Sequence, residues 1–398
     1  MERRNFIRLA GGGLVLAATS GISACASSAY PVQALEAWNG PVASETDPRR
    51  RALAYAITAP NPHNLQPWLA DLRENGVITV YTDPQRILPE TDPFGRQILI
   101  GHGAFLELLV MALAEQGLRA DVQLWPQGEL PAQLKDWRAA MKQPVARLTL
   151  QAGAQKDALF AQILNRHTVK TDFDITRAVP EAKLQQLMAS TGSPRSSASM
   201  KVSGTVQPEQ LLALRALCLE SAKVELRTPR TMMESIRLIR VGPNEILQHR
   251  DGISINSPFV RAMSAVGMFD RSQAPAPGSP ADKNAMARFE GHSNTSMGFV
   301  WISGSNTRAD QIEAGRVYVR LQLQATALGI GMHPMSQALQ EFPEMKPFYE
   351  QVHQLLLGHA APTQLQDATV QMFCRIGYAA EPAAASPRRA IEKFIVSS

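Results

Sequence analysis

The sequence predicts an α+β fold in which two similar halves follow each other in one chain. Short runs rich in β-branched residues predict strands, and the first two, at 69–72 and 77–81, flank Asn75-Gly76 as the arms of a hairpin would. Two long stretches with helical periodicity, at 96–116 and 311–327, are each followed by a helix-ending glycine. We therefore expect mixed, mainly antiparallel sheets with long central helices.

The first half is expected within residues 30–150. Its predicted elements are a helix at 49–58, the hairpin, the helix at 96–116, and strands at 121–125 and 146–150. A loop rich in turn formers, Ala59-Pro60-Asn61-Pro62-His63-Asn64, separates the first helix from the hairpin. Residues 30–48 have no periodicity and contain several prolines, which predicts a leader without regular structure.

Residues 151–398 predict the second half. Helices at 157–164 and 181–190, a strand at 299–302, the helix at 311–327 and a last strand at 371–376 follow in order. The long helices match at constant spacing, because Gly103 and Gly117 correspond to Gly315 and Gly329. The matching turns before these helices, at Pro60 and Pro194, are separated by fewer residues than the matching helix glycines. The second half is therefore expected to carry an insertion around 225–292, which we interpret as a lid or binding loop.

Residues 1–29 predict an export signal. Arg3-Arg4 with Phe6 precede a short apolar stretch, which is typical of a twin-arginine (Tat) signal, with an ordinary secretory signal as the alternative. Ile22-Ser23-Ala24-Cys25 resembles a lipoprotein box, whereas Ala24-Cys25-Ala26 fits plain cleavage equally well. The protein is expected in the periplasm or otherwise exported, with a lipid anchor at Cys25 left open. Because the Tat route carries folded proteins, it favours a bound redox cofactor.

Several function classes are excluded. The formal net charge of +5 falls to +3 without Glu2 and the three leader arginines, and no block of Lys/Arg with interleaved aromatics predicts nucleic-acid binding. The sequence has no His-Glu-x-x-His or paired-cysteine spacing for a metal, no Gly-x-Ser-x-Gly elbow and no Walker A sequence. Cys218 and Cys374 cannot form a disulfide scaffold, and whether they pair is left open.

Four segments carry a resemblance to a known family. The loop at 59–68 is similar to the nitroreductase motif Pro-Ser-x-x-Asn-x-Gln-Pro-Trp, and residues 166–170 are similar to the family's Arg-His/Arg-Ser-x-Lys/Arg segment. Residues 325–334 resemble the helix and loop below the flavin, and residues 372–389 resemble the last strand and basic tail. The chain thus resembles the nitroreductase-like FMN-binding family, and within it the fused, single-chain (Acg-like) branch.

The resemblance implies one FMN site between the halves. In the family, FMN lies at a dimer interface, with the basic segment from one subunit and the Asn-containing loop from the other. Here the first half keeps the loop and the second half keeps the basic segment, so a monomer acting as a pseudo-dimer is expected. The residues expected to bind the cofactor are Arg166, His167, Thr168, Lys170, Pro60, Asn61, Asn64, Pro334, Met335, Ser336, Arg388 and Arg389.

Each group has an expected role. The arginines are expected to bind the phosphate, since a guanidinium holds it through two hydrogen bonds. Lys170 would place positive charge near the pyrimidine end of the ring, and Asn64 would hydrogen-bond the ring edge. Backbone amides near Pro334, Met335 and Ser336 would lie close to flavin N5. No side chain is expected to be catalytic and no metal is expected, because the flavin supplies the chemistry.

These features predict an FMN-dependent oxidoreductase that passes hydride or electrons by a ping-pong scheme to a small nitroaromatic- or quinone-like acceptor in the cell envelope. The electron donor is left open among NAD(P)H, a membrane quinol and a partner reductase. The alternative is a non-enzymatic FMN carrier or store with the flavin covered by a lid. A third reading is a structural module that has lost the flavin, which the retained basic residues disfavour.

Overall fold

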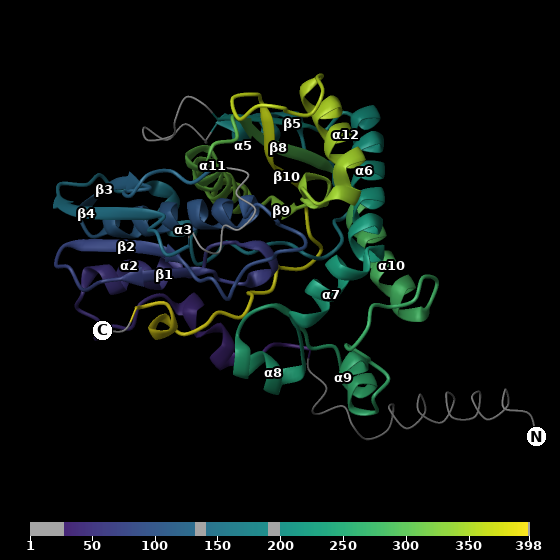
Figure 1. Ribbon diagram of the computed structural model, residues 1–398, viewed down its shortest axis with the longest axis horizontal. Coiled ribbons are helices and arrows are strands. Elements are labelled where there is room, and N and C mark those ends of the chain that lie inside the picture. The colour runs from purple at the N-terminus through teal and green to yellow at the C-terminus, as the bar shows by residue number, and fades with distance from the viewer. Residues whose placement is uncertain (1–27, 132–140, 190–199, 397–398) are drawn as a thin grey trace, which may run out of the picture.

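The computed structural model describes residues 28–131, 141–189 and 200–396. It contains two four-stranded antiparallel sheets and two long central helices, α3 (Arg96–Glu115) and α11 (Arg308–Ala327) (Figure 1). The predicted α+β class, with mainly antiparallel sheets and long central helices, is confirmed. The Tat-like arginines and Cys25 of the predicted leader lie outside the described residues.

The first half follows the predicted order. It contains α2 (Pro48–Ala56), β1 (Trp68–Asp71), β2 (Val77–Thr82), α3, β3 (Leu118–Leu124) and β4 (Ala146–Ala152). β1 and β2 form the predicted hairpin, with Trp68 opposite Thr82. The side chain of Asp47 accepts a hydrogen bond from the amide of Arg49 and so caps α2. The sheet order is β1-β2-β4-β3.

The second half repeats this topology. It contains α5 (Glu181–Ala189), β5 (Lys201–Thr205), β8 (Gly298–Gly304), α11, β9 (Gly331–Pro334), α12 (Lys346–Leu357) and β10 (Thr369–Gly377). The sheet order is β5-β8-β10-β9, which is the order of the first sheet when strands are matched along the chain. The first two strands are joined by residues 72–76 in one half and by residues 206–297 in the other.

The two central helices cross at the glycines that the sequence repeat aligned. A Cβ on Gly103 would lie 1.9 Å from the carbonyl oxygen of Ile312, and a Cβ on Gly315 would lie 1.9 Å from that of Ile100. The two contacts are reciprocal, as a local twofold axis requires. α3 is long and apolar enough to span a membrane, but 94% of its apolar window is buried inside the protein. It is therefore a core helix.

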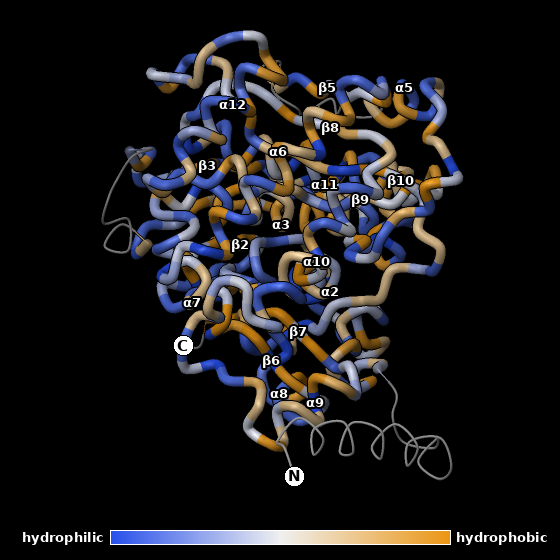
Figure 2. Tube along the Cα trace, turned by 90° about the vertical axis from the view of Figure 1, so that its right-hand side faces the viewer, coloured by the Kyte–Doolittle hydropathy of each residue, from blue (hydrophilic) through white to orange (hydrophobic). Residues whose placement is uncertain are grey.

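The long connection between β5 and β8 is fixed on the other half. It contains α6 (Pro208–Arg227), α7 (Pro229–Arg237), β6 (Ile239–Val241), α8 (Gly242–His249), β7 (Ile253–Ile255), α9 (Pro258–Ala265) and α10 (Pro280–Asn294). β6 and β7 make a short parallel pair, which lies with α8 and α9 at one end of the molecule (Figure 2). Arg86 Nη1 donates to the carboxylate of Asp251 at 2.6 Å. The carboxylate of Glu234 accepts from the amides of Glu90 and Thr91, each at 2.9 Å.

The end of the chain also returns to the first half. The amide of Ala70 on β1 donates to Phe394 O at 2.7 Å, and the amide of Arg388 donates to Ala34 O at 2.9 Å. Ala34 belongs to a 3-10 helix, Val32–Asn39, in the segment expected to lack regular structure, so that expectation was wrong. The segment is ordered by contact with the tail, which leaves no periodic signal in its own sequence.

Cys218 and Cys374 are both buried and unpaired. The two residues, Cys374 on β10 and Cys218 on α6, are free thiols, which answers the question that the sequence left open.

Candidate functional site

Two buried arginines from distant parts of the second half converge on one carbonyl of the first half. Arg166 Nη2 donates to Thr58 O at 2.7 Å, and Arg388 Nη2 donates to the same oxygen at 3.0 Å. Arg166 Nη1 also donates to Gln322 Oε1 on α11 at 2.7 Å. Arg388 Nη1 donates to Asn64 Oδ1. These contacts hold two like charges close together at the junction of the halves.

Neither guanidinium of this arginine pair, Arg166 and Arg388, forms an ion pair with a carboxylate in the described part of the chain. Burial lowers the pKa of Arg166 to about 10, and burial together with the charge of Arg166 lowers the pKa of Arg388 to about 9. The Nε atoms of both arginines, and Nδ1 of His167, are buried without a hydrogen-bond partner. Buried charges are normally paired, so this arrangement is suited to an anion.

A strained loop positions the tail that carries Arg388. His63, Asn64 and Gln66 have φ angles of 47°, 52° and 54°, and each such non-glycine residue costs about 1–3 kcal/mol. Asn64 Nδ2 donates to Pro387 O at 2.9 Å, and Gln66 Oε1 accepts from the amide of Arg389 at 3.0 Å. The loop conformation is therefore retained by its bonds to the tail.

Asn61 and Asn64, which the sequence named as cofactor-binding residues, form hydrogen bonds within the loop and to the tail. The amide group of Asn64 is engaged by Pro387 and Arg388. Asn61 Oδ1 accepts from the amide of Gln66 at 2.8 Å and Asn61 Nδ2 donates to Ala59 O at 3.0 Å, next to the buried Pro60. In this structure these side chains shape the loop and hold the tail.

An aromatic side chain covers the arginine pair. The guanidiniums of Arg166 and Arg388 lie 5.5 Å and 5.3 Å from the ring centre of Trp38. The ring of His167 lies 4.4 Å from that of Trp38. Burial and the two arginines lower the pKa of His167 to about 4, so it is neutral at pH 7. Sequence reasoning missed Trp38, because it lies in the segment without periodicity.

Lys170 extends the positive region toward the inserted segment. Its side chain is exposed, yet desolvation and the charges of Arg288 and Arg388 lower its pKa to about 8. Arg288 belongs to α10 of the insertion. The charge of Lys170, in addition to burial, helps to lower the pKa of His63 to about 4. Lys170 is therefore accessible but lies among protein groups, most of them basic.

α10 is seated directly on the segment that carries Lys170. His292 Nε2 donates to Lys170 O at 2.9 Å, and since a carbonyl only accepts, this nitrogen carries the proton. Gly291 allows a close approach, because a Cβ there would lie 2.6 Å from a carboxylate oxygen of Asp172, which would then have to shift. The amide of Phe173 donates to Thr295 Oγ1 at 3.1 Å just beyond α10. The end of the helix is thus fixed over residues 170–173.

Arg375 on β10 orders the histidines of this region. Its guanidinium donates to His333 Nδ1 at 3.0 Å, to His292 O at 3.0 Å and to Thr171 O at 2.7 Å. Burial and this charge lower the pKa of His292 to about 3 and that of His333 well below its usual value. Both histidines are therefore neutral, and His333 carries its proton on Nε2. Arg288, His292 and His333 were missed because no motif connects residues so far apart in sequence.

The residues at the end of β9 differ in what their backbone can offer. Pro334 has no N–H, and the amide of Met335 donates to Phe373 O at 2.8 Å within the sheet. The amide of Ser336 donates to no residue that the structure describes. Of the three residues named from the sequence, Ser336 alone has an available amide. Thr168 Oγ1 accepts from Gln322 Nε2 at 3.2 Å and so supports the segment that carries Arg166.

Arg389 is separated from the arginine pair. Its Nη2 donates to Gln66 O at 2.7 Å, and its guanidinium lies 4.4 Å from the ring centre of Phe394. Burial and the charge of Arg86 lower its pKa to about 10, with Asp83 and Asp251 acting in the opposite direction. Charges of both signs therefore act on Arg389, whereas the charge that acts on Arg388 is that of Arg166.

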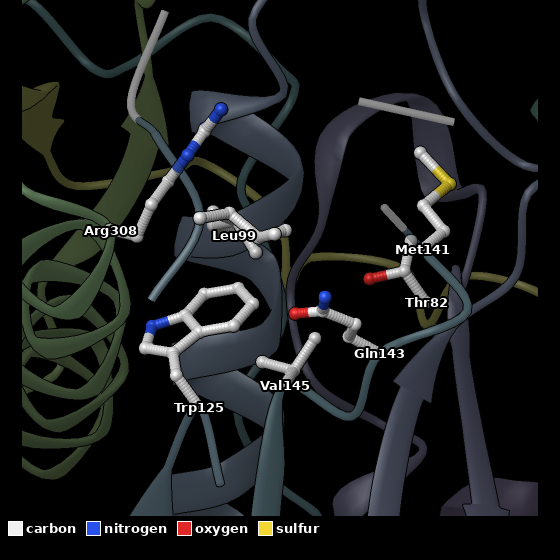
Figure 3. Close-up of a pocket in the computed structure, with 8 residues that line it drawn as sticks. Thr82, Leu99, Trp125, Met141, Gln143, Val145 and Arg308 are labelled. Carbon is white, nitrogen blue, oxygen red and sulfur yellow. The ribbon is translucent and has the colours of Figure 1, made fainter. Parts of the chain in front are cut away.

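A small pocket lies elsewhere, between β3, the segment before β4 and the start of α11 (Figure 3). It is lined by Thr82, Leu99, Trp125, Leu130, Met141, Gln143, Val145 and Arg308. None of these residues belongs to the basic region formed by Arg166, Lys170, Arg288 and Arg388. No group of His, Cys, Asp and Glu suited to a metal ion occurs among the described residues.

Comparisons with known proteins point to nitroreductases. No family model matches the chain. A Mycobacterium tuberculosis (H37Rv) protein named "Putative NAD(P)H nitroreductase acg" is 36% identical over 89 residues, covering 22% of this chain and 27% of that protein. The chain thus spans about a quarter of this curated relative.

Solved nitroreductases resemble the structure over part of its length. The FMN-dependent nitroreductase NfnB of Mycobacterium smegmatis, solved with NADPH, is 19% identical with a TM-score of 0.36, covering 60% of this chain and 96% of that one. A nitroreductase of Bacteroides fragilis with bound FMN is 12% identical with a TM-score of 0.32, covering 59% and 95%.

Proposed function

We propose that the arginine pair binds the phosphate of FMN and that the protein is a flavin-dependent oxidoreductase of the nitroreductase type. The carrying observation is that Arg166 and Arg388 share Thr58 O while lacking any described carboxylate partner. Their buried, unpartnered Nε atoms are donors suited to phosphate oxygens. The similarity to a protein named as a nitroreductase supports the choice of FMN over other phosphate ligands.

The other residues of the region fit the same ligand. Lys170 is a cation that can stabilise negative charge on a reduced flavin ring, and the Ser336 amide is an available donor at the end of β9. When bound, FMN supplies the hydride- and electron-transfer chemistry. The protein's own groups hold the ligand and exclude water. The neutral His167 and Trp38 close the region around the arginine pair.

The proposed reaction is reduction of a small nitroaromatic- or quinone-like acceptor in the cell envelope. NADPH is the first donor to test, because it is bound in the M. smegmatis structure, with a quinol or partner reductase next. The envelope location rests on the Tat-like leader, with or without a lipid at Cys25. Fractionation of cells that express the full chain tests it, since a purely cytosolic protein would contradict it.

A flavin carrier is the second candidate. It is favoured by the insertion, because α10 is fixed over residues 170–173 and the segment around Asp251 is fixed on the first half. Such an arrangement suits a covered flavin. The two candidates differ in whether a small molecule reaches the bound ring.

The deciding experiment compares FMN with riboflavin, which lacks the phosphate. Protein without its leader is titrated with each ligand, and flavin fluorescence quenching gives the two dissociation constants. We expect FMN to bind about 100-fold more tightly or better, because two guanidiniums contribute charge-assisted bonds of about 1.5–3 kcal/mol each. Equal affinities, or no binding of either ligand, would reject the phosphate site.

Anaerobic addition of NADPH and then dithionite separates the enzyme from the carrier. Flavin bands bleached by NADPH and restored by a nitroaromatic or quinone support the oxidoreductase. Bands bleached by dithionite alone, and not restored by either acceptor, favour the carrier.

A further inference from the structure

The basic region holds more positive charge than an FMN phosphate balances. Arg166, Lys170, Arg288 and Arg388 have no ion pair with a carboxylate in the described part of the chain, whereas a phosphate monoester carries about two negative charges at pH 7. The proposed site uses the arginine pair for the phosphate and Lys170 for the ring. Arg375 of the same region is occupied by its bonds to His333, His292 O and Thr171 O, so Arg288 is the cation that remains.

Arg288 is held at the site by the helix that carries it. It precedes His292 by one helical turn, so the two side chains lie on the same face of α10. That face is fixed by the bond from His292 to Lys170 O and by the contact of Gly291 with Asp172. Arg288 therefore lies near Lys170 because the backbone of α10 places it there.

The side chain of Arg288 is free to meet a ligand. It is exposed, and it forms no hydrogen bond or ion pair with any residue that the structure describes. Its charge acts on Lys170, His292 and His333, which are the groups of the same region. The hydroxyl of Tyr30, close enough to influence Arg288, donates to Ser254 O at 3.1 Å. Arg288 is thus an available guanidinium beside the proposed flavin site.

We propose that Arg288 binds a carboxylate of the small molecule that meets the flavin, so that the site selects acidic aromatic substrates over neutral ones. The proposal rests on the FMN site proposed above and adds the substrate class. A planar guanidinium offers two parallel donors to a carboxylate, which gives orientation as well as affinity. The insertion would then serve as the element that selects the substrate.

The test measures binding of two matched probes, 4-nitrobenzoate and 4-nitrobenzamide, to the oxidised protein by calorimetry. The flavin content of every preparation is first read from its visible spectrum. Three variants accompany the unsubstituted protein: Arg288→Gln, Arg288→Lys and the control Lys283→Gln. Lys283 is an exposed cation on the same helix whose position points about 140° away from Arg288.

We expect the unsubstituted protein and Lys283→Gln to bind nitrobenzoate about tenfold or more tightly than nitrobenzamide. Arg288→Gln should bring the ratio close to one without loss of FMN, and Arg288→Lys should keep part of the preference. A ratio near one in the unsubstituted protein, or an unchanged ratio in Arg288→Gln, overturns the proposal. Loss of FMN in Arg288→Gln also overturns it, by assigning Arg288 to the cofactor.

Failure of the FMN proposal has a different signature. It appears in the spectrum and in the riboflavin comparison, before any probe is added. Calorimetry needs no flavin signal, so the preference for nitrobenzoate is measured even on flavin-free protein. A preference that persists there and disappears in Arg288→Gln would support the acidic-ligand site alone.

Discussion

The two halves share one topology but use their central helices differently. α3 of the first half is a mostly apolar core helix, although it buries Arg96 at its start and Glu107. On α11 of the second half, the buried Arg320 and the half-buried Arg316 both donate to the Glu107 carboxylate at 2.9 Å. Two residues after Arg320 along α11, Gln322 accepts from Arg166. The helix of the second half therefore supplies the cations that balance Glu107 and also supports Arg166.

The same asymmetry extends to the candidate site. The first half contributes neutral acceptors, Thr58 O and Asn64 Oδ1. The second half contributes the cations, Arg166 and Arg388, and its insertion contributes Arg288. A symmetric dimer would build two equivalent sites, whereas this chain has divided one set of parts between its halves. The two halves therefore share a scaffold, and each contributes different groups to the candidate site.

The largest effect is expected where the halves are alike. Gly103→Ala and Gly315→Ala should each lower the free energy of unfolding by about 3 kcal/mol or more, because the new methyl meets backbone that cannot move aside. Urea unfolding measures both. Gly117→Ala is the control: its φ is 78° and nothing lies within 4 Å of the added Cβ, so only about 1–2 kcal/mol of backbone strain is expected. Losses no larger than that of the control would refute the close crossing.

A smaller effect is expected on FMN binding, where the adjacent Arg388 and Arg389 differ in their contacts. Arg388→Gln should weaken FMN binding about 10- to 100-fold, because it removes a buried, charge-assisted donor of the arginine pair. Arg389→Gln, on the adjacent residue, should weaken it less than about threefold, since that guanidinium donates to Gln66 O and lies over the ring of Phe394 instead of joining the arginine pair. Fluorescence titration with FMN decides. Riboflavin affinity serves as the reference and should change in neither variant.

The smallest effect is a difference in pH dependence. The pKa of Lys170 is lowered from 10.5 to about 8, so between these pH values the unfolded chain keeps a proton that the native protein has released. Unfolding then takes up protons, and this residue makes the FMN-free protein more stable as the pH rises through this range. FMN should reverse the contribution, because the anion favours the protonated lysine.

Thermal unfolding between pH 7 and 10, with and without FMN, checks this sign. Lys170→Met provides the reference, since it removes the titrating group but keeps most of the side-chain volume. The difference between the two proteins isolates Lys170 from other titrating residues. If the Lys170→Met protein shows the same pH slope as the unsubstituted protein in both conditions, Lys170 does not couple to FMN.

Much of this organisation could be predicted from the chain alone. The hairpin at Asn75-Gly76, the matching helices and the glycines at 103 and 315 are signals of local chemistry and of regular spacing, and the structure contains each of them. Arg166 and Arg388 were also identified, because they lie in segments with a recognisable order of residue types. Such features depend on nearby residues, and a sequence records those directly.

Only the tertiary structure decided which of the basic residues meet. It brought Arg388 to Arg166, directed Arg389 to Gln66 O, and seated the helix that carries Arg288 on the segment of Lys170. These outcomes depend on the path of a tail and of a 92-residue connection that cross to the other half. Contacts between residues more than 100 positions apart leave no periodicity, and electrostatic balance depends on distance in space. Signals between residues near in sequence therefore determined the scaffold, whereas only the folded structure determined which charged side chains lie close together.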